Sequence, residues 1–317
     1  MRAYLIQRLL LSVPVVFLVV LLTFLMLQGM PGDAIENRLA GTGLSQEQIE
    51  VFREEAGLNR PLHVQFGSWM VDIARGDLGE SLFTGRSVAD ELKTRLWPTL
   101  ELGALGLLVA VLLAIPLGTI SAVWMNSPVD YAARLFAILG LSIPEFFLAV
   151  SVILVASTQF GYFPPLGFVQ IWDDPWLNLQ QVWMPVIVVG IARSAALARI
   201  MRSSLLEVLR ADYIRTARAK GLSERNVIVR HALRTSLIPF LTVLGLQVGA
   251  MIGGLVVAET IFNIPGMGAY IVSAVLTRDF VPLQATVLLI ALLLVTVNLI
   301  VDLSYGWLDP RIRYGST

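Results

Sequence analysis

Residues 235–258 read TSLIPFLTVLGLQVGAMIGGLVVA and contain no charged side chain. A helix needs about 20 consecutive apolar residues to cross a bilayer, and this run is long enough. The whole 317-residue chain has the same character, since 56% of its residues are hydrophobic and only 15% are charged. Soluble domains carry about 25% charged residues. The sequence therefore predicts an all-α, polytopic membrane protein.

Five further apolar runs accompany this one. They lie between Arg8 and Asp33 and at 101–130, 134–158, 176–198 and 280–301. The first could be a signal peptide, but it exceeds the usual apolar core of about 7–15 residues, so an uncleaved anchor is preferred. The third is interrupted by Glu145, and the fourth contains Pro185 and Arg193. We predict six transmembrane helices.

Basic residues predict the orientation of the chain. With the N-terminus inside, the segments 1–8, 122–134, 193–234 and 305–317 face the cytoplasm, and they hold 15 of the 23 basic residues. We therefore expect both termini to be cytoplasmic.

The largest segment predicted outside, 31–98, has the pattern of a small helical domain. A capping box begins at Ser45, and Gly57 suits the end of that helix. Pro61 and Gly76 suit the limits of a second helix, and Ser87 can cap a third before Trp97-Pro98. The segment is either a solvated spacer or a surface for a soluble partner, and we favour the partner surface.

The largest segment predicted inside, about 199–238, is expected to form helix, turn and helix. The first helix covers 204–220, Gly221 is a left-handed stop, and Ser223 caps a second helix running to Thr235. Its arginines allow three interpretations: a topology signal, a patch for anionic lipid, or a docking element for a cytoplasmic protein. The ordered stop at Gly221 and cap at Ser223 favour a defined structural role over a segment that only carries positive charge.

Residues for enzymatic chemistry are missing from the sequence. There is no cysteine, the two histidines are His63 and His231, and neither Lys93 nor Lys220 lies in a phosphate-binding glycine loop. We expect no catalytic residue, no metal and no cofactor bound by this chain, and a net charge of zero gives no reason to expect nucleic acid.

Two places could form part of a transport pathway. Glu145, after Pro144, lies either near mid-membrane or at the cytoplasmic edge, and a charge within a span is a functional candidate. Between the last two spans, a tight turn forms either a re-entrant gate or an ordinary surface loop. The candidate pathway or gate residues are Pro144, Glu145, Glu259, Pro265, Gly266 and Gly268.

Several strings, taken in order, resemble the dipeptide/oligopeptide permease B family, the membrane permeases of bacterial peptide/nickel ABC importers. They are Pro31-Gly32-Asp33, Gly57-Leu58-Asn59-Arg60-Pro61, Gly76-Asp77-Leu78-Gly79-Glu80-Ser81, the 213–222 stretch, His231-Ala232-Leu233-Arg234, Pro265-Gly266-Met267-Gly268 and the tail 309–314. Each string is weak alone, but their order and spacing cover nearly the whole chain.

The resemblance implies a type I importer permease in a bacterial inner membrane. Its parts would be 1–30 with the first span, an extracytoplasmic helical domain at 31–98, and a permease core at 99–317. The ATPase-coupling loop would comprise Arg215, Thr216, Ala217, Arg218, Ala219, Lys220, Gly221 and Leu222. Arg215 stands where the family motif has glutamate, so this loop carries a basic residue at that position.

The resemblance also implies the partners. They are a second, homologous permease subunit forming a heterodimer, two ATP-binding subunits that hold ATP and Mg, and an extracytoplasmic substrate-binding protein. The expected cargo is di- or oligopeptides, with nickel chelates, glutathione or oligosaccharides as alternatives. An ion-coupled secondary transporter and a membrane scaffold are the rival classes.

Overall fold

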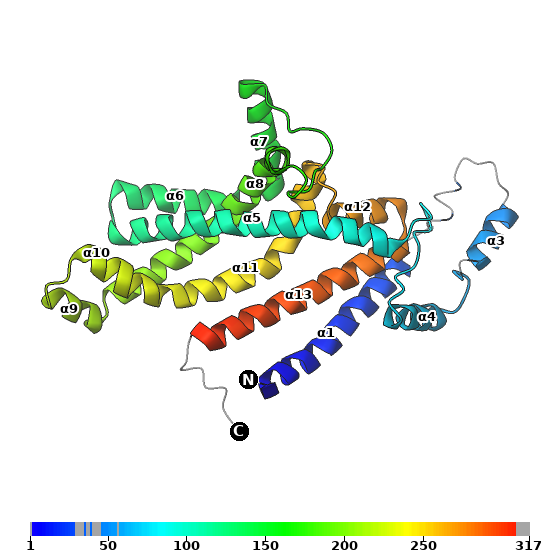
Figure 1. The fold of residues 1–317 in the computed structure, drawn as a ribbon, viewed down its shortest axis with the longest axis horizontal. Coiled ribbons are helices and arrows are strands. Elements are labelled where there is room, and N and C mark those ends of the chain that lie inside the picture. Colours follow the sequence, from blue (N-terminus) through cyan, green and yellow to red (C-terminus); the bar gives the residue numbers. More distant parts are fainter. Residues whose placement is uncertain (1, 29–34, 36–38, 40–45, 56, 309–317) are drawn as a thin grey trace. The chain divides into compact units, whose positions relative to one another are not determined.

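The computed structural model describes residues 2–28, 35, 39, 46–55 and 57–308, and within them the chain is helical (Figure 1). The elements are α1 (Arg2–Gln28), α3 (Gln46–Glu55), α4 (Leu62–Ala74), α5 (Val88–Val123), α6 (Pro128–Ser142), α7 (Glu145–Phe160), α8 (Pro175–Leu209), α9 (Asp212–Ala219), α10 (Glu224–Asn226), a π-helical turn (Val227–Ala232), α11 (Leu233–Ile261), α12 (Met267–Thr277) and α13 (Phe280–Leu308). The all-α prediction is confirmed.

Four of the described helical stretches are long and apolar enough to cross a bilayer: Val88–Val123, Pro175–Leu209, Glu224–Ile261 and Phe280–Ile300. A fifth span results if α6 and α7, which meet at 107°, count as one broken span. The described apolar part of α1, Leu10–Met26, is shorter. A count of six therefore stays a prediction.

The chain divides into two compact units. One comprises 1–99 with 265–296, and the other comprises 100–264 with 297–317. The predicted division at 31–98 and 99–317 is a different partition and stays a prediction.

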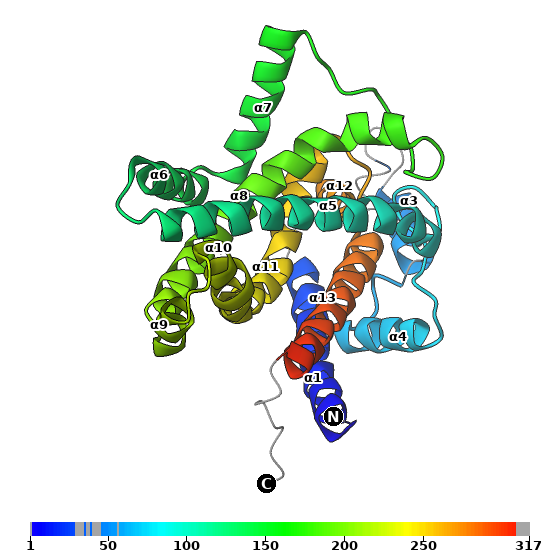
Figure 2. The same cartoon turned by 60° about the vertical axis from the view of Figure 1, so that its left-hand side comes forward.

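In the second unit, α8 is the central helix and packs against α6, α7 and α11 (Figure 2). Glycine lets α8 approach α5 closely, because a Cβ on Gly190 would collide with the Val109 side chain and lie 3.2 Å from the carbonyl oxygen of Gly106. Small residues at such crossings allow membrane helices to pack backbone to backbone.

The turn between α5 and α6 corrects the predicted second run, 101–130. The helix ends at Val123, and Ser127 caps α6 by accepting a hydrogen bond from the Asp130 amide. Asn126 adopts φ 64° in this turn. The run is apolar throughout, so hydropathy alone does not reveal where the chain reverses.

The third predicted helix of the 31–98 segment is not separate from the second span. The Ser87 hydroxyl does accept a hydrogen bond from the Asp90 amide, at 3.4 Å, at the start of α5. The helix then continues through Pro98 to Val123. An internal proline removes one backbone hydrogen bond but does not have to end a helix, and α5 continues past Pro98.

The first unit has its own small core, made by α1, α4, α5 and α13. Phe66 of α4 lies edge-on to Phe24 of α1, with ring centroids 5.2 Å apart. Gly57 and Gly76 adopt positive φ after α3 and α4, as predicted for helix stops. The Ser45 cap lies outside the described residues, as do Pro31-Gly32-Asp33 and the 309–314 tail.

Candidate functional site

The predicted coupling loop contains a short helix fixed by one buried face. In α9, Ile214 and Ala217 are buried and join a cluster with Ala122 of α5, Leu205 of α8 and Val227. Because α8 and α9 must both bury apolar residues in this cluster, the chain reverses at 210–211. The single helix predicted over 204–220 is therefore wrong: α8 ends at Leu209 and α9 starts at Asp212.

Gly221 ends this element in the left-handed conformation, with φ 79°, as the sequence predicts. Ser223 occupies the next N-cap position, but its side chain forms no capping hydrogen bond. The helix that follows does not stop at Thr235, because α10 continues through the π-helical turn into α11.

An ion pair bridges the turn on the outside. Arg218 Nη2 lies 2.6 Å from Glu224 Oε1, and Arg218 Nε lies 3.1 Å from Oε2. The pair joins the end of α9 to the start of α10 across Gly221. Both side chains are largely exposed, so the pair contributes little to stability.

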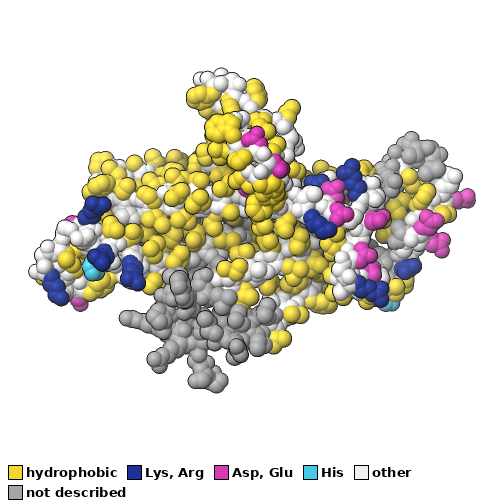
Figure 3. All heavy atoms as spheres, viewed as in Figure 1, with side chains coloured by type: hydrophobic (Ala, Val, Ile, Leu, Met, Phe, Trp, Pro, Cys, Tyr) yellow, Lys and Arg dark blue, Asp and Glu magenta, His cyan; other side chains and the backbone are white. Residues whose placement is uncertain are grey.

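The opposite face of α9 is free for a partner. Of the eight predicted coupling residues, only Ala217 is buried, and Arg215, Thr216, Arg218, Ala219, Lys220, Gly221 and Leu222 are exposed. Basic side chains gather at the end of the second unit where α9 and α10 lie (Figure 3). The arrangement is a helix held rigidly by one face that presents a basic face outward.

The predicted pathway residue Glu145 is the first residue of α7, after the bend at Ile143-Pro144. Its Oε2 lies 3.4 Å from Nη2 of Arg193, which comes from the middle of α8, and both side chains are 17% exposed. Sequence reasoning singled out both charges but did not pair them. In the described part of the chain, Glu145 Oε1 and Arg193 Nε are buried without a hydrogen-bond partner.

A third helix closes over this pair. A Cβ placed on Gly254 of α11 would lie 2.5 Å from Arg193 Nη2 and 2.5 Å from Glu145 Oε2. Glycine at this position therefore makes room for the ion pair at the point where α7, α8 and α11 meet. The side chain of Glu145 faces protein rather than lipid, which is the usual placement of charges within a membrane.

The other gate candidates lie from the last turn of α11 to the first turn of α12. Glu259 is fully buried near the end of α11. Gly266 is the N-cap residue of α12, with an extended backbone (φ −95°, ψ −176°), and Gly268 is buried in the first turn. The predicted tight turn is present and leads into a short apolar helix, which by length and composition is neither a full span nor a simple surface loop.

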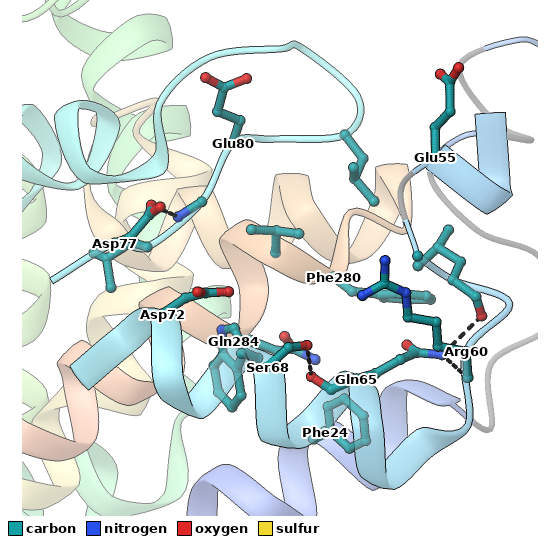
Figure 4. A pocket seen from close by; sticks show the side chains of 17 residues that line it. Phe24, Glu55, Arg60, Gln65, Ser68, Asp72, Asp77, Glu80, Phe280 and Gln284 are labelled. Carbon is teal, nitrogen blue, oxygen red and sulfur yellow. Dashed lines mark hydrogen bonds between the residues drawn. The ribbon is translucent and has the colours of Figure 1, made fainter. Parts of the chain in front are cut away.

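The first unit contains a pocket of about 370 Å³ between α4, the loop after it and the start of α13 (Figure 4). Four carboxylates line it, from Glu55, Asp72, Asp77 and Glu80, together with the single basic residue Arg60. Figure 4 shows Asp72, Ser68 and Gln65 along one face of α4. The pocket is therefore acidic and belongs to the segment predicted to meet a partner.

Two buried aspartates were not singled out from the sequence. Asp130 accepts hydrogen bonds from Ser121 and from Arg202 and Arg134, and it joins α5, α6 and α8. Asp279 accepts hydrogen bonds from the Ser81 hydroxyl, at 2.5 Å, and from the Phe83 amide. The spacing of four residues between Asp130 and Arg134 was the one feature of the sequence that could have predicted an ion pair here.

The described residues contain no group of three or more His, Asp or Glu side chains arranged to hold a metal ion.

Comparison with known families covers almost the whole chain. Residues 114–314 match the family model of the binding-protein-dependent transport system inner membrane component. Residues 1–102 match the model of the N-terminal part of the same kind of component. The chain belongs to this family. It is accordingly a polytopic inner-membrane permease of an ABC importer.

Individual relatives match this chain over their full lengths. The glutathione transport system permease protein GsiC of Escherichia coli O6:H1 (strain CFT073) is 40% identical over 314 residues, covering 99% of this chain and all of that protein. The dipeptide transport system permease protein DppB of Alkalihalophilus pseudofirmus is 38% identical over 334 residues, again covering 99% of this chain and all of the relative.

A solved structure supports the fold. The crystal structure of an amino acid ABC transporter with histidines matches with a TM-score of 0.52 over 71% of this chain and 95% of that chain, at 17% sequence identity. The all-α permease fold that the sequence predicted is confirmed.

Proposed function

We propose that this permease forms the transmembrane core of an importer for short peptides, together with a second, homologous permease subunit. The support for this cargo is that relatives of equal length are named for dipeptide and glutathione transport.

The coupling site in this proposal is α9. Separate ATPase subunits, which hold ATP and Mg, dock on its exposed basic face at the cytoplasmic side, where both chain termini also lie. The observation that carries the proposal is the one-sided burial of α9, because Ile214 and Ala217 tie it to α5 and α8. A push on the exposed face is then transmitted to the spans as a rigid movement.

The extracytoplasmic partner is a substrate-binding protein that docks on the 31–98 segment. The acidic pocket beside α4 suits a partner surface carrying lysine or arginine. This chain binds no cofactor and has no catalytic residue in the proposal, since ATP hydrolysis belongs to the partner subunits.

The test is purification of the complex followed by transport. The chain is co-expressed with its genomic neighbours, isolated by a tag on this subunit, and placed in proteoliposomes. ATP-dependent uptake of labelled dipeptide or glutathione that requires the binding protein is the expected result. Uptake driven by an ion gradient without any ATPase would refute the proposal and favour a secondary transporter.

A further inference from the structure

The second unit contains a groove that the transport mechanism above does not use. It is lined by residues of α5, α6 and α8, which lie in the same part of the second unit (Figures 1 and 2). Its cavity is about 270 Å³. Most of the wall is apolar, with Leu117 from α5, Ile138 and Leu141 from α6, and Ala198 from α8.

One end of the groove is basic. Arg134 of α6 and Arg199 and Arg202 of α8 line it, and Asp130 is the carboxylate that pairs with two of them. Asp130 is fully buried and pairs with both Arg134 and Arg202, at 2.9 Å each. Arg199 is exposed and forms no ion pair with any side chain that the structure describes. One carboxylate against three guanidinium groups leaves a net charge of about +2.

Arg134 is only partly occupied by these contacts. Its Nη2 donates to Asp130 and its Cζ lies 4.6 Å from the centre of the Tyr131 ring, while 38% of the side chain stays exposed. A guanidinium presents several donors in a fixed geometry that matches phosphate well. The groove therefore offers an apolar slot that ends in positive charge that the described carboxylates do not balance.

Two of these arginines stand at the ends of apolar runs in the sequence, where lipid headgroups are expected. Arg134 stands at the start of the apolar run 134–158, and Arg199 directly follows the run 176–198. Two exposed aromatic residues, Trp124 and Tyr131, lie in the same region of the chain, at the α5–α6 turn and in the first turns of α6. Trp and Tyr are enriched where a membrane helix meets the headgroup layer.

We propose that this groove is a binding site for one anionic phospholipid. An acyl chain lies along Leu117, Ile138 and Leu141, and the phosphate is held by Arg199 and Arg134. Asp130 keeps Arg134 and Arg202 in position without neutralising them. Basic pockets between membrane helices are a known kind of site for anionic headgroups, and the charge of this groove selects them over zwitterionic lipids.

The test uses the complete transporter with its partner subunits, reconstituted in nanodiscs. A phosphatidylglycerol analogue with a photoreactive acyl chain is cross-linked, and labelled peptides are identified by mass spectrometry. We expect labelling of residues 133–141 that is displaced by phosphatidylglycerol but neither by phosphatidylcholine nor by soluble glycerol phosphate. Displacement by phosphatidylcholine to the same extent would overturn the proposal, as would displacement by glycerol phosphate.

Three variants make the test specific. Arg199→Gln removes one basic residue, worth about 1 kcal/mol near an anionic surface, so labelling should weaken about five-fold. Arg210→Gln is the matched control, because Arg210 lies at the end of the same helix but outside the groove, and labelling should not change. Ala133→Phe fills the slot and should abolish labelling with all the arginines intact.

A protein occupant is the competing interpretation. The chain has no cysteine, so Ile138→Cys introduces a single thiol into the groove wall. We expect this thiol to react with a lipid-soluble maleimide in the assembled transporter. A thiol that is protected in the complete transporter and cross-links to the second permease would show that protein covers the groove, and it would overturn the lipid site.

Discussion

Glu145 on α7 and Arg193 on α8, 48 residues apart, form an ion pair of 3.4 Å. The pair lies where α11 contributes a glycine, and α11 packs against both of the other helices. Glu145 follows the 107° bend between α6 and α7, so the pair ties the second half of the broken span to α8. A charge pair inside a permease core is a strong candidate for a group that changes partner during transport.

Gly254→Ala should disturb this pair directly. The new methyl would lie 2.5 Å from both Arg193 Nη2 and Glu145 Oε2, so a helix or an ion-pair atom must move. Both atoms are the ends of flexible side chains, so the ion pair gives way rather than a helix, and the loss of stability stays below the roughly 1–3 kcal/mol that is typical of an overpacked rigid core. Gly253→Ala is the control, since a Cβ there meets nothing within 4 Å. We expect a lower unfolding temperature and slower uptake for Gly254→Ala only, and equal loss in both variants would contradict the prediction.

Glu145→Gln should leave assembly intact while changing transport. Removing one member of a fully buried pair costs about 3–5 kcal/mol, and here the cost is smaller because each side chain keeps 17% of its exposure. The double variant Glu145→Gln with Arg193→Gln should recover stability but not transport. The measurements are complex yield, unfolding temperature and ATP-dependent uptake. If the double variant recovers both stability and ATP-dependent uptake, the ion pair is structural and not part of the pathway.

Asp130→Asn should be the most destabilising of these changes. Asp130 is fully buried and accepts hydrogen bonds from Ser121, Asn126, Arg134 and Arg202. Asparagine has no charge for the two guanidinium groups, and loss of one partner from such a pair costs about 3–5 kcal/mol. Asp212→Asn is the control, because the Asp212–Arg215 pair is exposed and contributes little. Similar unfolding temperatures for Asp130→Asn and Asp212→Asn would refute the prediction that the buried Asp130 network stabilises the fold.

The sequence predicts the helical spans and the left-handed Gly221 well, because both depend on local properties. An uncharged run of 20 residues has few alternatives to a membrane helix. A glycine after an amphipathic turn is a common helix stop. The order of the family strings identified the fold without any three-dimensional information.

What the sequence does not predict depends on contacts between distant segments. Nothing near Leu209 marks the break between α8 and α9, which arises because Leu205, Ile214 and Val227 share one cluster. The bend at Pro144 and the pairing of Glu145 with Arg193 likewise require the positions of α8 and α11. Asp130 was read as the limit of an apolar run, whereas it is a buried junction of three helices.

Gly221→Val should uncouple ATP hydrolysis from transport while the complex still assembles. A Cβ on Gly221 meets nothing within 4 Å, so the substitution tests only the backbone, which has φ 79°. A β-branched residue is strained there by about 1–3 kcal/mol, and the turn after α9 should shift. Gly221→Asn is the matched control, because asparagine tolerates left-handed backbone, and the effect of Gly221→Asp should lie between those of valine and asparagine.

The measurement is the ratio of peptide imported to ATP hydrolysed in proteoliposomes. A ratio that falls for valine and stays near normal for asparagine is expected, and an unchanged ratio for valine would show that the left-handed turn plays no part in coupling.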